Sequence, residues 1–116
     1  MTTMDKKAIE KAKALINVKI IDYTPHSVVI KTIIKKTTGK ISAVSFDTDE
    51  ELPEKTIPFD TFIQIIDGQA EIIIDGIPNY LITGQSIIIP AHTSSILRAK
   101  ERFKMISTII KSGYDD

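Results

Sequence analysis

Short stretches rich in isoleucine, valine and threonine follow one another along most of this 116-residue chain. Isoleucine alone fills 24 positions, and β-branched side chains favour strands because they pack well on a pleated surface. We count roughly nine or ten strands, with turn residues about every six to twelve positions, a spacing typical of an antiparallel sandwich or barrel. No helical pattern lies between these strands, which excludes a parallel sheet with crossover helices.

The turns of this pattern carry recognisable chemistry. The Asp-Gly pairs at 67–68 and 75–76 predict tight turns, because this dipeptide readily adopts the left-handed backbone of hairpin loops. The stretch 47–58 is polar and acidic, and we interpret it as a solvated loop. Eight of the predicted strands are assigned to residues 27–35, 40–46, 61–66, 69–74, 77–82, 86–89, 96–99 and 105–110.

A helical pattern occurs only before the strands. Apolar residues recur at helical spacing over residues 4–16 and predict a short helix. A helix of about three turns is not stable alone in water, so we expect it to dock on the barrel or on a second subunit. The prediction is one domain, with the helix in residues 1–17 and a barrel in residues 18–116.

Two strands are apolar at successive positions, 72–74 and 87–89, where a strand with one wet face would alternate. Their outer faces must therefore be covered. A homodimer is the simplest solution, because a two-fold contact buries the same patch twice.

Composition excludes several classes of protein. Fifteen basic residues balance fifteen acidic ones, so the basic surplus of a nucleic-acid binder is missing. The absence of cysteine excludes disulfides, thiolate metal sites and a cysteine nucleophile. No apolar run approaches the roughly 18 residues of a membrane span, and the N-terminus lacks the apolar centre of a signal peptide. We therefore expect a soluble, cytoplasmic protein without a membrane partner.

Two stretches resemble the conserved motifs of the cupins. Residues 54–68 resemble the first motif, in which His-x-His is followed by Glu and then by a glycine, here Gly68. Their Pro-Phe-Asp run at 58–60 is similar to that of many small bacterial cupins. Residues 84–92 resemble the second motif through their Gly-x5-Pro spacing. The resemblance, which covers about residues 40–105, implies an all-β, jelly-roll barrel of the cupin 2 type.

In cupins, three histidines and one glutamate usually hold a metal inside the barrel. The resemblance puts Lys55 and Ile57 at the first two histidine positions, Thr61 at the glutamate position and Ser95 at the last histidine position. None of these is a good ligand for a divalent transition metal. We therefore predict no metal, no cofactor and no catalytic residue of the metal-dependent kind.

Other sites remain open at this level. An unconventional metal site could use His92 with Glu54 and Asp60, or could use His26, although strand alternation puts both carboxylates off the inward face. Lys55 places an ammonium where the metal of the family would be. It could bind a ligand carboxylate, act as a base, or extend to the barrel mouth toward the acidic stretch.

Our first hypothesis is a non-catalytic cupin that binds a small anion, such as a carboxylate, inside its barrel. The candidate ligand-binding residues are Lys55, Ile57, Thr61, Ser95 and His92. One alternative is a metal-independent or unconventional-metal enzyme, such as an isomerase, an epimerase or a dioxygenase-like protein. Another is a structural dimer whose barrel is filled by inward residues such as Ile57, Ile63 and Ile65. A pocket of a few hundred cubic ångströms would favour ligand binding, and a solid interior would favour the structural alternative.

Overall fold

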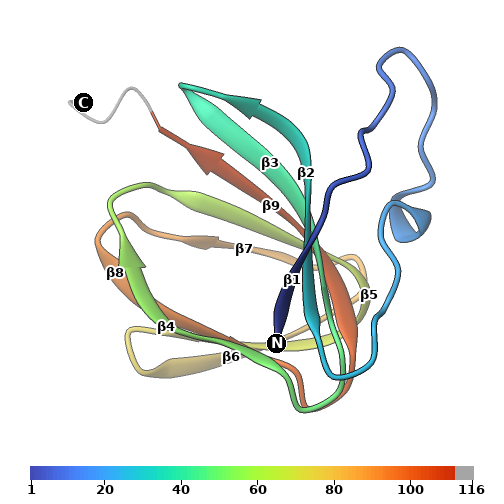
Figure 1. The fold of residues 1–116 in the computed structure, drawn as a ribbon. Helices are drawn as coiled ribbons and strands as arrows, with labels where there is room; N and C mark the ends of the chain where they lie inside the picture. The colour runs from blue at the N-terminus through green and yellow to red at the C-terminus, as the bar shows by residue number, and fades with distance from the viewer. Residues whose placement is uncertain (112–116) are drawn as a thin grey trace.

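The computed structural model describes residues 1–111, which form one strongly curled sheet (Figure 1). Residues 112–116, the end of the predicted barrel domain 18–116, lie outside the described residues. The strands within residues 1–111 are β1 (Thr2–Asp5), β2 (Val28–Lys36), β3 (Gly39–Phe46), β4 (Glu51–Ile57), β5 (Thr61–Ile74), β6 (Ile77–Ile82), β7 (Ser86–Ile89), β8 (Thr93–Arg98) and β9 (Phe103–Ile110). The all-β prediction is confirmed, and every pair except the parallel β1–β2 is antiparallel.

The strands follow the order β1-β2-β3-β9-β5-β8-β4, with β6 and β7 also paired to β5. The first half of β5 pairs with β7 and β9, and its second half pairs with β6 and β8. This long strand therefore joins two halves of the sheet that curl toward each other. The result is a half-barrel whose open side lies between β3 and β4 (Figure 1).

The predicted hairpin at Asp67-Gly68 is wrong, because β5 runs through both residues. Its register against β9 shifts between Ile65 and Asp67, which marks a bulge. Gly68 has a φ of +84°, and a Cβ there would lie 2.3 Å from the carbonyl oxygen of Arg102. The glycine thus permits a close backbone approach where β5 passes between the two halves. The other predicted turn is confirmed, since Asp75 and Gly76 both have positive φ between β5 and β6.

The acidic stretch is only partly a loop, because its residues 51–57 form β4 and pair with β8. Charged residues and Pro53 are unusual in strands, so the sequence did not predict this one, but an edge strand tolerates both. The register shifts between Leu52 and Lys55. This irregularity lets both side chains face the interior despite their odd separation.

The predicted helix over residues 4–16 is not confirmed. Thr2–Asp5 form β1 beside β2, a single 3-10 turn follows at Asn17–Lys19, and Ala12 has a left-handed φ of 63°. A three-turn helix is only marginally stable on its own, whereas pairing with β2 gives the backbone of Thr2–Asp5 hydrogen-bond partners. The segment packs Ile20 and Ile21 outside the sheet against Val29 and Ala43.

Two lysines hold this N-terminal segment against the sheet. The Nζ of Lys31 donates to the carbonyl oxygen of Ile20 at 3.1 Å, and the Nζ of Lys104 donates to that of Val18 at 2.7 Å. Lys104 also lies 4.8 Å from the ring centre of Tyr23, whose hydroxyl donates to Asp67 at 2.7 Å. Burial and this hydrogen bond raise the pKa of Tyr23 above its ordinary value.

The main core fills the end of the half-barrel away from its mouth. Phe46 and Phe103 are fully buried there and stack with their ring centres 4.3 Å apart. The inward residues of β5, Ile63, Ile65 and Ile72, pack in the same cluster. Within residues 1–111 no helix is long and apolar enough to cross a membrane.

Candidate functional site

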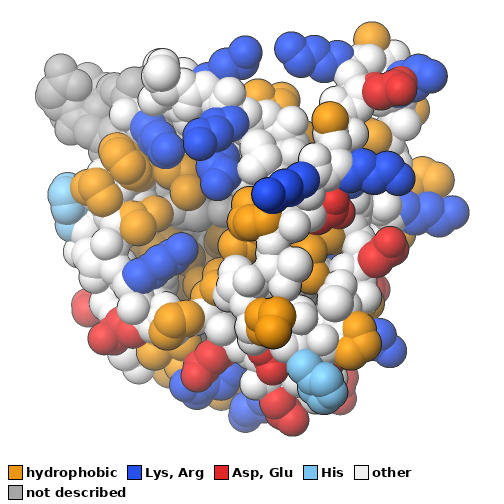
Figure 2. All heavy atoms as spheres, in the orientation of Figure 1, with side chains coloured by type: hydrophobic (Ala, Val, Ile, Leu, Met, Phe, Trp, Pro, Cys, Tyr) orange, Lys and Arg blue, Asp and Glu red, His pale blue; other side chains and the backbone are white. Residues whose placement is uncertain are grey.

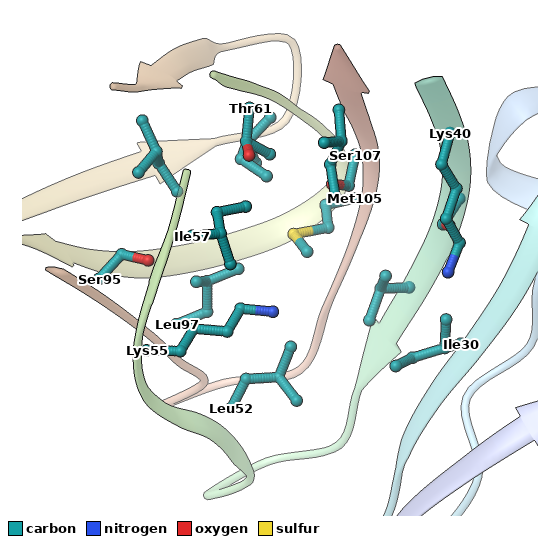
Figure 3. Close-up of a pocket in the computed structure, with 15 residues that line it drawn as sticks. Ile30, Lys40, Leu52, Lys55, Ile57, Thr61, Ser95, Leu97, Met105 and Ser107 are labelled. Atoms are coloured by element: carbon teal, nitrogen blue, oxygen red, sulfur yellow. The ribbon is translucent and has the colours of Figure 1, made fainter. Parts of the chain in front are cut away.

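A pocket of about 120 Å³ opens inside the half-barrel (Figure 3). Strands from both halves of the sheet contribute to its walls. Its apolar lining consists of Ile30, Val44, Leu52, Ile57, Ile63, Ile89, Leu97, Met105 and Ile109. Its polar lining consists of Lys40, Ser42, Lys55, Thr61, Ser95 and Ser107. Among the described residues, no aspartate or glutamate lines it.

Four of the five predicted site residues line this pocket. Lys55 and Ile57 come from β4, Thr61 begins β5, and Ser95 lies on β8 directly opposite Lys55 in the strand pairing. His92 lies outside the lining, as an exposed turn residue with a φ of 62° whose N–H donates to the carbonyl oxygen of Ile57 at 2.8 Å. His92 does not line the pocket because it precedes β8 and belongs to a turn, whereas Ser95 lies within that strand.

The cations of the pocket lie toward its mouth. Lys55 is exposed, yet Figure 3 shows its side chain reaching from β4 into the space between the strands. Lys40 stands across this space on β3 and is half-buried. Within residues 1–111, neither ammonium forms an ion pair. Figure 2 shows basic side chains beside a hollow with hydrophobic atoms in its floor.

Three of the four hydroxyl groups of the pocket lie deeper. Ser42, Thr61 and Ser95 are all buried. Thr61 Oγ1 is buried and has no hydrogen-bond partner within residues 1–111, which is an unusual state for a polar atom in a folded protein. This hydroxyl therefore has an unused capacity to bond at the wall of the pocket.

Solved structures of very similar shape show which family has this architecture. A conserved protein of unknown function from Streptococcus pyogenes is 28% identical, with a TM-score of 0.86 over 93% of this chain and 95% of that chain. A cupin superfamily protein from Desulfitobacterium hafniense is 24% identical, with a TM-score of 0.84 over 93% and 99%. A cupin 2 conserved barrel domain protein from Leptotrichia buccalis is 25% identical, with a TM-score of 0.78, and the match covers 81% of this chain and 46% of that one.

The chain has the cupin fold. No protein-family model and no curated protein matches its sequence. The likeness of its three-dimensional structure to solved cupins confirms the resemblance found in the two motifs. Gly68, the glycine of the first motif, lies in the bulge of β5.

A divalent metal does not fit the residues that the motif resemblance assigns to the metal positions of the cupins. Lys55 brings an ammonium, which repels a cation, and Ile57 has no donor atom. Only the hydroxyls of Thr61 and Ser95 remain, and catalytic metal sites require about three imidazole or carboxylate ligands. No chemistry can be assigned to a metal on this donor set.

The unconventional alternatives lack a suitable geometry as well. Figure 2 shows the two pale-blue histidine side chains of the chain far apart from each other. Glu54 accepts a hydrogen bond from Ser94 Oγ at 2.9 Å, and Asp60 accepts one from the Ala91 N–H at 2.8 Å. Residues 1–111 contain no group of three histidine, aspartate or glutamate side chains able to hold a metal.

Three polar residues of the pocket escaped the sequence reasoning, namely Lys40, Ser42 and Ser107. A signal for the first two existed, because residues 40, 42 and 44 alternate along a predicted strand and so share one face. Ser107 shares the inward face of β9 with Met105 and Ile109. The sequence did not show that the inward faces of β3 and β9 line the same pocket as the face of β4 that carries Lys55.

Proposed function

We propose that this cupin binds a small anion, such as a carboxylate, inside its barrel, and that it does so without a metal and without catalysing a reaction. The observation that carries the proposal is the charge of the pocket: two lysine ammoniums, with no carboxylate among the lining residues of the described part of the chain. An ammonium without a partner is a ready binding group for an anion, because charge-assisted hydrogen bonds are stronger than neutral ones.

The neighbouring carboxylates are engaged elsewhere, which supports this proposal. Glu51 and Glu71 both contact Arg98, at 3.3 and 3.5 Å. Glu54 bonds to Ser94 on the outside of the pocket. The anion that Lys55 lacks within the described residues would then have to come from outside them.

The size of the cavity points to a small ligand. At about 120 Å³ it is below the few hundred cubic ångströms of ordinary ligand pockets. It is nevertheless close to the roughly 150 Å³ of an engineered cavity that accepts benzene. The interior is therefore neither a large pocket nor solidly packed, which favours a ligand of few atoms over a purely structural barrel.

A thermal-unfolding screen tests the proposal. The probes are acetate, lactate, malonate, succinate, benzoate and phosphate, each titrated on the purified wild type, Lys55→Met and Lys36→Met. We expect a bound anion at about 100 times its Kd to raise the unfolding temperature by about 10 °C. Lys55→Met should abolish this shift and fold at least as well, because it keeps the volume of the stem and removes an unpaired charge.

Lys36→Met is the matched control, since Lys36 is an exposed lysine of β2 that does not line the pocket. It should respond like the wild type. If none of the anions stabilises the wild type, or if Lys55→Met responds identically, the proposal fails. Elemental analysis belongs to the same experiment: about one metal per chain, retained after dialysis against a chelator, would overturn its metal-free part.

A further inference from the structure

We infer that the ligand of this pocket is a monocarboxylate with an apolar body, bound with the body inside the barrel and the carboxylate at the mouth between Lys40 and Lys55. This inference rests on the proposed anion binding and adds the ligand class and its orientation. It follows from how polarity changes with depth in the pocket.

The deep wall of the pocket is apolar. Ile63, Ile89, Leu97 and Met105 are all at most 4% exposed and come from three strands and the end of a fourth. Each methylene of a ligand that leaves water for such a wall is stabilised, because the hydrophobic effect scales with the apolar area removed from water. A small anion with no apolar part would make no contact with this apolar wall.

The mouth is the only part of the described lining that carries charge. Lys55 is exposed and Lys40 is half-buried, and they lie on opposite sides of the opening, on β4 and β3 (Figure 3). A carboxylate held there keeps part of its hydration while it meets two ammoniums. The reverse orientation would push it against buried isoleucine and methionine, where desolvation of a charge is expensive.

The volume sets a limit on the body. A cavity of about 120 Å³ is slightly smaller than the roughly 150 Å³ that accepts benzene. A body of about five or six carbons would therefore fill it. Longer chains must leave part of the body at the mouth, where burial gains nothing.

The test is a series of straight-chain monocarboxylates from acetate to decanoate, with matched primary alcohols, measured by calorimetry on the wild type, Lys40→Met, Lys55→Met and Lys36→Met. We expect the affinity for carboxylates to rise about fourfold per methylene and to level off near hexanoate. Hexanol should bind at least tenfold more weakly than hexanoate. Lys40→Met and Lys55→Met should each weaken hexanoate at least fivefold and leave hexanol unchanged, and Lys36→Met should change neither.

The outcomes separate this inference from the proposed function. If malonate or succinate binds better than hexanoate and affinity does not grow with chain length, the apolar-body inference is wrong while anion binding stands. If no carboxylate binds at all, the inference fails, and if phosphate does not bind either, the proposed anion binding fails with it. Binding that grows with chain length but ignores both pocket lysines would mean adsorption to an apolar outer surface, and that result also overturns the inference.

Discussion

Gly68 and Gly76 have almost the same backbone twist, with φ of +84° and +80°, but very different surroundings. At Gly68 an added Cβ would meet the carbonyl oxygen of Arg102 at 2.3 Å and Phe103 at 3.0 Å, whereas at Gly76 nothing lies within 4 Å. The first glycine is needed for space and for conformation, and the second for conformation alone. Comparing the two glycines therefore separates the energetic cost of a steric clash from the cost of a left-handed backbone.

We predict that Gly76→Ala lowers the free energy of unfolding by about 1–2 kcal/mol, the cost of a left-handed alanine. Gly68→Ala should lower it by about 3–5 kcal/mol, because a backbone oxygen cannot yield cheaply. Urea denaturation followed by circular dichroism measures both values. Equal losses in the two variants would contradict the close approach of β5 to Arg102.

At the scale of elements, residues 17–23 lie against the outer face of the sheet and are held there by side chains more than by regular secondary structure. Lys31 and Lys104 are both buried and both donate to backbone carbonyls of residues 18–20. Removing such a donor leaves the carbonyl without a partner, at a cost of about 1–3 kcal/mol. The loss should be local, since the strands of the barrel keep their own ladders.

We therefore predict that Lys104→Met speeds amide hydrogen exchange in residues 17–23 while exchange in β5 stays slow. Exchange followed by mass spectrometry resolves the two regions. Lys36→Met, at an exposed position, is the control and should leave both regions unchanged. Faster exchange throughout the barrel after Lys104→Met would show that the segment is part of one cooperative unit with it.

At the scale of the whole molecule, the outer face of the sheet is only partly covered. The N-terminal segment covers one part of it through Ile20 and Ile21. Elsewhere Phe62 and Ile88 are register partners on the outer face of β5 and β7, and they are 38% and 61% exposed. The isoleucine run 87–89 thus has a buried side and a wet side, and we propose that a second copy of the chain covers the wet one.

We predict a dimer at micromolar concentration, measured by light scattering during size exclusion. Ile88→Lys should give a monomer, because a charge in the middle of an apolar contact is costly. Ile77→Lys is the control, since Ile77 is 66% exposed at the turn between β5 and β6, away from β7. A monomer mass for the wild type at high concentration would rule out the dimer.

Local sequence determined most of the strands, all but β1 and β4, and the confirmed turn of this protein. Alternating β-branched residues and the Asp75-Gly76 pair act within a few positions, so their effect can be read from the chain. Motif spacing also placed Lys55, Ile57, Thr61 and Ser95 together in the barrel, where they line one pocket. These predictions needed no knowledge of which strands pair.

Only the tertiary structure decided the rest, because it depends on contacts between distant segments. The start of the helical pattern at residues 4–16 pairs with β2 as part of β1, and the acidic stretch became a strand by pairing with β8. Asp67-Gly68 became a bulge because the chain at Arg102 lies against it. Lys40 faces the same pocket as Lys55 because the sheet curls, and curling follows from how β5 joins its two halves. No local pattern encodes this placement of β3 and β4 on opposite sides of one pocket.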